Sequence, residues 1–360
     1  MNNVKVFKKY YDDIFNNLNN TIKDFNNSLI SKNYILNENL SRFSDLNSGG
    51  KLIRGILVNL GYSISINEKS NYSNQLSLAY EIFQTSILIH DDIIDNDNKR
   101  RNTDTIHYSN YKKYKNFCNN LNELDQNSKS IALCVGDYGL YLSNNIIVEA
   151  YSNDKNLSKV LKYYNDIVLK TIEGELLDVI LPFECKNNLY SGSNLEEDII
   201  SVYKLKTAYY TIVGPLCIGM ILGGLDESSL NEITKFGEKI GIAYQIQDDL
   251  LGIYSDSIGK VIGSDIKEFK QTILYSYIKK YNRKYEVELL KYYGSDIIND
   301  DVIYNVRKIF DESGAKDYAI NLMNSLYSEG IEILEKINWI NEEYKIILNG
   351  FVEYLKGRKK

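Results

Sequence analysis

The sequence has 360 residues, of which 44% are hydrophobic and 25% charged, with a formal net charge of -6. This is the composition of a globular protein with enough chain to bury a large core, and the negative charge argues against a general binder of nucleic acid or anionic membranes. Two histidines are too few for most zinc hydrolases, and four widely spaced cysteines without a CxxC pair favour free thiols in a reducing compartment.

Helical periodicity runs through most of the chain. Val4 to Ile30 carries apolar residues at helical spacing and predicts an amphipathic packing helix. The pattern breaks at Asn47 to Gly50 and resumes over Lys51 to Ile66, whereas Asn110 to Ser130 is polar and predicts a surface loop or insertion. Further helices are expected near Ile131–Tyr151, Leu157–Val179, Leu195–Leu222, Leu230–Ile253, Lys267–Lys280, Val287–Tyr292, Asp300–Ser313, Lys316–Ile337 and Asn341–Lys356.

No strand-like alternation, repeat or linker competes with these helices, so we expect one all-α domain. The N-terminal residues lack the uninterrupted apolar core of a signal peptide. No apolar run is long enough to predict a transmembrane segment. We therefore expect a cytoplasmic protein.

Three carboxylates follow an apolar helical run in the stretch Ala79 to Arg101, AYEIFQTSILIHDDIIDNDNKRR. At helical spacing Asp91 and Asp95 share one face, with Asp92 beside it. Like charges four residues apart repel, and carboxylates at a helix C-terminus oppose the macrodipole, so the cluster needs a cation. Crowded oxygen ligands suit magnesium, which also binds substrate phosphates. A solvated acidic helix end explains one such motif equally well.

A second copy of the pattern favours the metal site. Gly241 to Asp256 reads GIAYQIQDDLLGIYSD, another apolar helical segment, and it carries Asp248 and Asp249. Two such helices, arranged face to face, would hold a cluster of divalent cations, which is what binding and ionising a diphosphate requires.

Three further stretches accompany the two aspartate motifs: GGKLIRG (Gly49 to Gly55), KTAYY (Lys206 to Tyr210) and GKVIGSDIKEFK (Gly259 to Lys270). As a set, the five motifs resemble those of the trans-isoprenyl diphosphate synthases, in particular the farnesyl and geranylgeranyl diphosphate synthases. The motifs run in family order from residue 49 to the C-terminus. The resemblance implies a single polyprenyl synthase domain over residues 1–360, folded as an isoprenoid-synthase-type helical bundle around a central cavity.

The same resemblance implies a prenyltransferase that condenses isopentenyl diphosphate (IPP) with dimethylallyl, geranyl or farnesyl diphosphate. Mg²⁺-dependent ionisation, condensation and elimination would give geranylgeranyl diphosphate and some farnesyl diphosphate. A strictly farnesyl diphosphate synthase and a non-catalytic regulatory subunit of a synthase remain alternatives. Family members are usually homodimers, so the resemblance also implies a second copy as partner.

The family's site residues carry over onto matching positions. The implied metal ligands hold about three Mg²⁺ ions per active site; they are Asp91, Asp92, Asp95, Asp248 and Asp249. The allylic diphosphate would be bound by Arg100, Lys206, Lys260 and Lys270. IPP would be bound by Lys51, Arg54, Gln84 and Arg101. Catalysis would depend on Asp91, Asp92, Lys206, Thr207, Gln245 and Asp248, with the Thr207 hydroxyl and the Gln245 amide near the allylic carbon.

Product length in the family depends on the depth of the cavity below the first aspartate helix. Ser86 and Ile87 stand five and four residues before Asp91, where farnesyl synthases of the eukaryotic kind carry aromatic residues. Serine leaves space, which predicts elongation from C15 to C20, and Phe83 would be the next stop one turn further.

The chain departs from the family pattern at two places. Gly252 stands in DDLLG where an aspartate or asparagine is usual, which removes one outer metal contact. Asn102 and Asp104 replace the usual glycine and proline after the arginine pair. The basic tail KGRKK, which includes Arg358, matches a segment that closes over IPP in farnesyl synthases.

Two other readings fit less of the sequence. A class I terpene cyclase shares the first aspartate motif but lacks an IPP site. An HD-type metal phosphohydrolase would use His90 and Asp91 but needs more histidines than the chain has.

Overall fold

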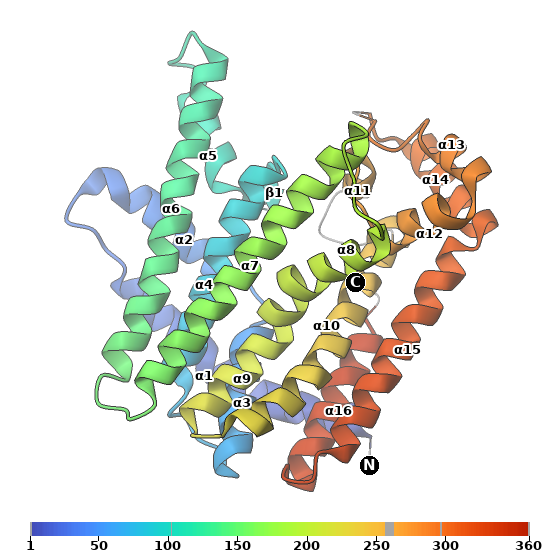
Figure 1. Cartoon of the computed structure of the whole chain (residues 1–360). Helices are drawn as coiled ribbons and strands as arrows, with labels where there is room; N and C mark the ends of the chain where they lie inside the picture. The colour runs from blue at the N-terminus through green and yellow to red at the C-terminus, as the bar shows by residue number, and fades with distance from the viewer. Residues whose placement is uncertain (1, 102, 256–262, 296, 359–360) are drawn as a thin grey trace. The chain divides into compact units, whose positions relative to one another are not determined.

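The computed structural model describes residues 2–101, 103–255, 263–295 and 297–358, and these are almost entirely helical (Figure 1). The elements, in chain order, are α1 (Asn3–Ser28), α2 (Tyr34–Asn47), α3 (Ile53–Ile66), α4 (Asn74–Ile94), β1 (Lys99–Arg100), β2 (Thr103–Asp104), α5 (Ile106–Tyr114), α6 (Leu121–Ala150), α7 (Leu157–Lys186), α8 (Leu195–Val202), the π-helix η1 (Tyr203–Val213), α9 (Gly214–Leu222), α10 (Glu227–Tyr254), α11 (Ser264–Lys267), α12 (Ile273–Tyr281), α13 (Arg283–Leu289), α14 (Asp300–Ser313), α15 (Ala315–Lys336) and α16 (Glu342–Lys356). The expected all-α fold is confirmed.

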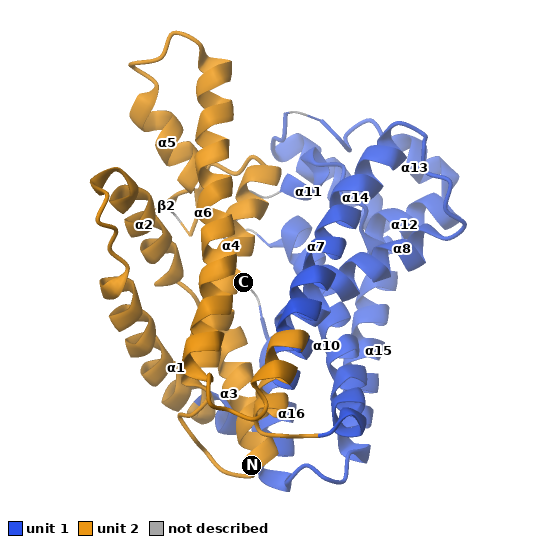
Figure 2. Cartoon of the chain, turned by 60° about the vertical axis from the view of Figure 1, so that its left-hand side comes forward, with its two compact units in different colours: residues 1–8, 163–217, 226–360 blue, residues 9–162, 218–225 orange. Residues whose placement is uncertain are grey.

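The chain forms two compact units, coloured separately in Figure 2. Unit 1 comprises residues 1–8, 163–217 and 226–360, and unit 2 comprises residues 9–162 and 218–225. The first aspartate motif lies in unit 2 and the second in unit 1. The prediction of a single domain over 1–360 stays a prediction.

Helix α4 forms the centre of unit 2. Most apolar residues in its first half are buried, and α6 packs closely against it at Gly139, where a β-carbon would overlap the Ser86 hydroxyl and lie 2.7 Å from the Phe43 ring. Burial of a large apolar side chain contributes roughly 1.5–3 kcal/mol, so Phe83, fully buried on α4, is a substantial part of this core.

In unit 1, the π-helix η1 is held between α7 and α10. A β-carbon on Gly174 of α7 would overlap the backbone of Lys206, and one on Gly241 of α10 would overlap Ala208. Glycine at both positions therefore allows two backbones to approach η1 at the residues KTA. A π-helix is rare and often marks a functional site, because its wider turn redirects side chains.

Most of the predicted helices are confirmed, with α14 starting and ending at the predicted residues. Two predictions are wrong. The predicted loop Asn110–Ser130 is largely helical, since it contains the end of α5 and the start of α6. The predicted helix Lys267–Lys280 is broken after α11, because Phe269 adopts φ 58° and Thr272 caps a new helix by accepting from the Tyr275 N–H.

Helices α2 and α5 have no counterpart among the predicted elements. Both are polar, and local sequence does not reveal the tertiary bond that joins them: Asn110 Nδ2 donates to Asn39 Oδ1 (2.9 Å). Side-chain N-caps also stabilise helix starts where apolar periodicity is weak. Asn33 accepts from the Ile35 N–H at the start of α2, and Asn120 accepts from the Glu123 N–H at the start of α6.

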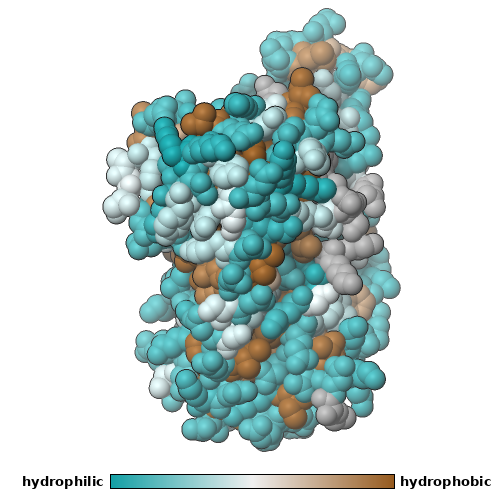
Figure 3. Space-filling view, turned by 90° about the vertical axis from the view of Figure 1, so that its right-hand side faces the viewer, coloured by the Kyte–Doolittle hydropathy of each residue, from teal (hydrophilic) through white to brown (hydrophobic). Residues whose placement is uncertain are grey.

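By length and hydropathy alone, two helical stretches of the described chain could cross a membrane, Leu121–Ala150 and Leu195–Leu222. The apolar window of the second is 83% buried within the protein, as in the core helix of a globular domain. The predicted absence of a transmembrane segment stays a prediction. The face in Figure 3 is mainly hydrophilic, with its hydrophobic residues in small separate patches.

Candidate active site

The first aspartate motif ends helix α4. Asp91 and Asp92 lie in its last turn, and the C-cap residue Asp95 donates its backbone N–H to Asp91 O (2.8 Å). Arg100, on β1, holds the first two carboxylates: its Nε donates to Asp92 Oδ1 (2.5 Å) and its Nη2 to Asp91 Oδ2 (2.9 Å). The antiparallel pairing of Arg100 with Thr103 in the short β1–β2 pair holds the arginine in this position.

The environment of Asp92 favours an additional cation. Burial, together with the nearby charges of Asp91 and Asp97, raises its pKa to about 7 although Arg100 opposes the shift. Its Oδ2 is buried and has no hydrogen-bond partner among the described residues. A buried carboxylate oxygen without a donor is costly, so the motif fits a divalent cation.

The second aspartate motif lies in α10 of unit 1, and its two carboxylates differ. Asp249 is buried and both of its oxygens accept hydrogen bonds, Oδ2 from the Tyr203 hydroxyl and Oδ1 from Gln245 Nε2 (2.9 Å). Burial raises the pKa of Asp249 well above its usual value, and the charge of Asp265 adds to the shift. Asp248 is 34% exposed, and Arg358 Nη1 pairs with its Oδ1 (2.9 Å).

These observations favour Asp248 over Asp249 as a metal ligand in unit 1. Within the ranges that the structure describes, no three His, Cys, Asp or Glu side chains converge to hold a metal ion. Magnesium is compatible with such a donor set, since it takes one or two carboxylates and completes its shell with water and substrate phosphate. The assignment of all five aspartates as ligands stays a prediction.

Gly252, where the chain departs from the family motif, lies beside Asp265, which the sequence analysis did not identify. A β-carbon on Gly252 would lie 3.2 Å from Asp265 Oδ2, which comes from the start of α11. A carboxylate from later in the chain therefore lies beside the position where the motif lacks its own.

Thr207 and Gln245, predicted to act together, are in direct contact. The Thr207 hydroxyl donates to Gln245 Oε1 (2.6 Å), and the Gln245 amide continues to Asp249. Tyr203, which sequence reasoning missed, completes the chain by donating to Asp249 and accepting from Ile273 N–H (3.1 Å). Each hydrogen bond in this series therefore restricts the orientation of the next side chain.

Two predicted diphosphate-binding lysines meet at one carboxylate. Asp178, on α7, accepts from Lys206 Nζ and Lys270 Nζ through the same oxygen, each at 2.7 Å, and Glu175 also pairs with Lys206 (2.9 Å). Burial alone would raise the pKa of Asp178, but the two ammonium groups outweigh it and hold the pKa well below its usual range. The fourth predicted allylic-diphosphate residue, Lys260, lies outside the described residues.

All four predicted IPP residues lie in unit 2. Arg54 Nη1 donates to the Gln84 amide oxygen (2.8 Å) when the amide is oriented to satisfy both of its contacts. Arg101, at φ 52°, lies over the Gly49–Gly50 backbone and donates to Leu46 O (3.0 Å). Lys51 is exposed at the start of α3.

The family described as polyprenyl synthetase matches residues 37–310, more than half of the chain. The chain belongs to the polyprenyl synthetase family. It is 25% identical to the geranylgeranyl diphosphate synthase of Sulfolobus acidocaldarius over 92% of both chains. It is 29% identical to the synthase of the same name from Saccharolobus solfataricus, over 74% of this chain and 72% of that one.

A solved structure has the same fold. It is the geranylgeranyl pyrophosphate synthase of Corynebacterium glutamicum, complexed with isoprenyl diphosphate and magnesium. The TM-score is 0.84 at 22% identity, with 97% of this chain and 99% of that chain covered. The predicted family and fold class are therefore confirmed.

The predicted chain-length residues of this polyprenyl synthetase have different environments. Ser86 is buried against Gly139 and Phe43, and its hydroxyl donates to Ile82 O (3.0 Å). The absence of a side chain at Gly139 thus allows the close approach of α4 and α6 at Ser86. Phe83 is fully buried, and Ile87 is partly exposed. Their role in product length stays a prediction.

Replacing Tyr203 by phenylalanine should lower the free energy of unfolding by about 1–3 kcal/mol, because a buried Asp249 oxygen and the Ile273 N–H both lose their partner. Urea unfolding at pH 7 measures this loss. Tyr209→Phe on the same π-helix is the matched control: its hydroxyl donates to Glu238 in a partly buried setting, so the loss should stay under about 1 kcal/mol. Equal losses for both variants would contradict a special role for Tyr203.

Proposed function

We propose that this protein is a short-chain trans-prenyl diphosphate synthase that condenses IPP with allylic diphosphates to give geranylgeranyl diphosphate and some farnesyl diphosphate. The observation that supports the proposal is that basic and polar side chains form two sets, which we assign to two different anions. Arg100, Lys206 and Lys270 accompany the aspartate motifs, whereas Arg54 and Gln84 form a second set on α3 and α4. A condensation of two diphosphates needs both.

Relatives support the same activity. Besides the two geranylgeranyl diphosphate synthases, the chain is 27% identical to a protein of Methanocaldococcus jannaschii named short chain isoprenyl diphosphate synthase, over 74% of both chains. The predicted prenyltransferase activity agrees with these names.

The aspartates Asp91, Asp92, Asp95, Asp248 and Asp249 are the proposed magnesium-binding residues. Bound magnesium would stabilise the negative charge that develops on the departing diphosphate. The side chains of Asp91 and Asp248 are 12% and 34% exposed, whereas Asp249 is buried and orients Gln245. We propose about three Mg²⁺ ions per active site.

Lys206 and Lys270 are the proposed donors to the allylic diphosphate, together with Arg100. Asp178 holds both ammonium groups at one point before substrate arrives. Because the hydroxyl hydrogen of Thr207 is directed at Gln245, the lone pairs of its oxygen are available to positive charge at the allylic carbon. The departing diphosphate would take the proton lost in the last step.

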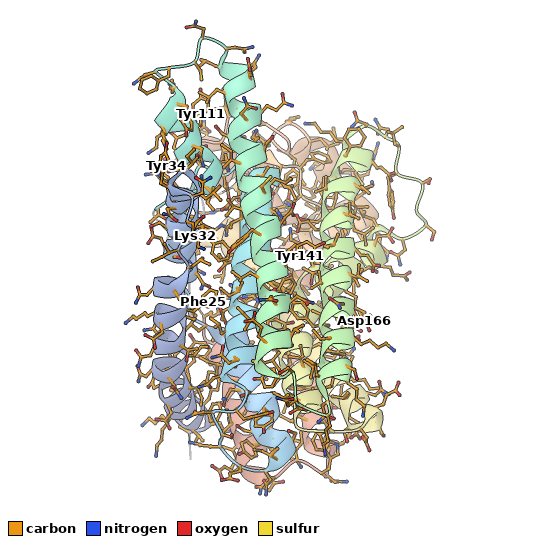
Figure 4. The ribbon with its side chains drawn as sticks, turned by 90° about the vertical axis from the view of Figure 1, so that its left-hand side faces the viewer. Phe25, Lys32, Tyr34, Tyr111, Tyr141 and Asp166 are labelled. Carbon is orange, nitrogen blue, oxygen red and sulfur yellow. The ribbon has the colours of Figure 1, made fainter. Side chains whose placement is uncertain are left out.

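Assembly as a homodimer and a cytoplasmic location belong to the same proposal. The described part of α7 exposes apolar side chains at helical spacing: Leu169, Ile172, Leu176, Ile180 and Phe183. Helix α6 exposes Tyr138 and Tyr141, the latter labelled on α6 in Figure 4. Rows of exposed apolar side chains mark interaction surfaces, and a second copy would cover them. A monomer in light scattering would contradict this.

Product analysis tests the proposal. Purified protein is incubated with Mg²⁺, labelled IPP and dimethylallyl, geranyl or farnesyl diphosphate, with an EDTA control. We expect Mg²⁺-dependent C20 product with a smaller C15 fraction. Exclusively C15 product would still show a prenyl diphosphate synthase but would contradict the predicted C20 product. Allylic substrate consumed without IPP would indicate a cyclase, and no elongation with any starter would favour a regulatory subunit.

A further inference from the structure

Glu81 is a buried carboxylate in the middle of α4 to which the proposed reaction gives no role. It is 3% exposed. Burial raises its pKa, while the Gly55 backbone N–H and the charges of Arg54 and Arg101 act in the opposite direction. A carboxylate is retained in such a place only when its partners compensate the loss of water, so its contacts indicate what it does.

The first contact of Glu81 is the start of helix α3. That helix begins after Leu52, which has φ 50° and makes no side-chain cap. Glu81 supplies the missing acceptor from another helix, since its Oε1 accepts from the Gly55 N–H (2.7 Å). A negative charge at this end also interacts favourably with the helix dipole. The bond fixes the backbone that carries Arg54.

The second contact reaches the Arg54 side chain through Gln84. With the amide orientation assigned from its hydrogen-bond network, Gln84 nitrogen donates to Glu81 Oε2 (2.8 Å) and its oxygen accepts from Arg54 Nη1 (2.8 Å). Glu81 thereby determines which way the amide points. One carboxylate oxygen of Glu81 thus holds the backbone next to Arg54, and the other holds the Gln84 amide that contacts the Arg54 side chain.

Gly55 makes this arrangement possible. A β-carbon there would overlap Leu18 Cδ2 of α1 (2.5 Å) and would lie 3.1 Å from Ser77 O and 3.2 Å from Glu81 Cγ on α4. Any side chain at position 55 would push α3 away from α4 and lengthen the bond from its N–H to Glu81. The close packing of the two helices and the orientation of Arg54 are therefore one structural feature.

We propose that Glu81 is a positioning residue that pre-orients Arg54 and Gln84 for the diphosphate of IPP. The inference rests on the proposed function, because it assigns these two side chains to the second anion. Arginine has many rotamers, and fixing one before binding reduces the entropy lost on association. Glu81 touches no substrate atom; it acts through its two neighbours.

The test compares Glu81→Gln and Glu81→Asp with the wild type in steady-state kinetics and in direct calorimetric titration with IPP. Glutamine keeps the size but cannot offer two acceptor oxygens. We expect KM for IPP to rise about 10–100-fold in Glu81→Gln, the loss of one or two hydrogen bonds to charged groups. KM for the allylic substrate should change less than about 2-fold, and Glu81→Asp should lie in between.

Ser77→Ala is the matched control, since Ser77 is also buried on α4, one turn before Glu81. It should leave both KM values within about 2-fold of wild type. A double-mutant cycle with Gln84→Ala should be non-additive, because the two side chains act through one contact. If Glu81→Gln does not fold, the KM values of Glu81→Asp and its double-mutant cycle with Gln84→Ala test the proposal instead.

Equal changes in both KM values, or additivity in the cycle, would reduce Glu81 to a structural role and overturn the inference. This failure is distinct from a failure of the proposed function. In the latter, the wild type itself neither binds IPP in the titration nor elongates any allylic substrate, and the assignment of Glu81 falls with it.

Discussion

Asp91→Asn should lower kcat by about 10³-fold while the protein stays folded. Asp91 is one of two acidic side chains held by Arg100, and it keeps part of its surface accessible for a cation. Asparagine preserves the size and an acceptor for the Arg100 Nη2 but removes the charge that a divalent cation requires. Losing one electrostatic contact to a developing anion typically costs about 10²–10³ in rate, and losing part of a metal site costs more.

The measurement is IPP-dependent elongation at increasing Mg²⁺, with Asp97→Asn as control. Asp97 is close enough for its charge to act on Asp92, but it is not a predicted ligand. Its variant should keep kcat within about 3-fold, in line with ordinary surface changes. The half-saturating Mg²⁺ concentration should rise only in Asp91→Asn. Full activity of Asp91→Asn at low Mg²⁺ would remove this aspartate from the site.

Asp178→Asn should destabilise the protein by about 2–4 kcal/mol at pH 7, because it leaves the partly buried ammonium groups of Lys206 and Lys270 without their shared carboxylate. Activity should fall as well, since both lysines lose the point that holds them together. Asp166→Asn is the matched control on the same helix. Asp166 is exposed (Figure 4), so its variant should stay within about 0.5 kcal/mol of wild type.

The contribution of Asp178 to the free energy of unfolding should depend on pH in a definite direction. In the folded protein the pKa of Asp178 lies well below the value of about 3.9 in an unfolded chain. The carboxylate therefore stabilises the fold above about pH 4, and this stabilisation is lost as pH falls through the folded pKa. Urea titrations of wild type and Asp178→Asn should show a constant difference from pH 7 to about pH 5 and a shrinking one below about pH 4. A difference that grows on acidification would contradict the argument.

The sequence alone was sufficient for the features that depend on local pattern. Apolar residues at helical spacing predict α1 and α14 because one face of each must be buried, whatever it packs against. The acidic clusters at the ends of apolar helices are equally local, and they indicate a cation without any tertiary contact. The family follows from motifs that are short, ordered and chemically distinctive.

Only the tertiary structure decided which groups act on one another. Asp178 and Lys270 are 92 positions apart, and Tyr203 and Asp249 are 46 apart, so no local pattern connects them. The same holds for Glu81, which looks like any polar residue of an amphipathic helix until α3 packs against it. Apolar periodicity indicates which residues are buried. Hydrogen bonds between helices depend instead on how the helices pack against one another. That is why the sequence located the aspartates and the fold supplied the residues that hold their neighbours in place.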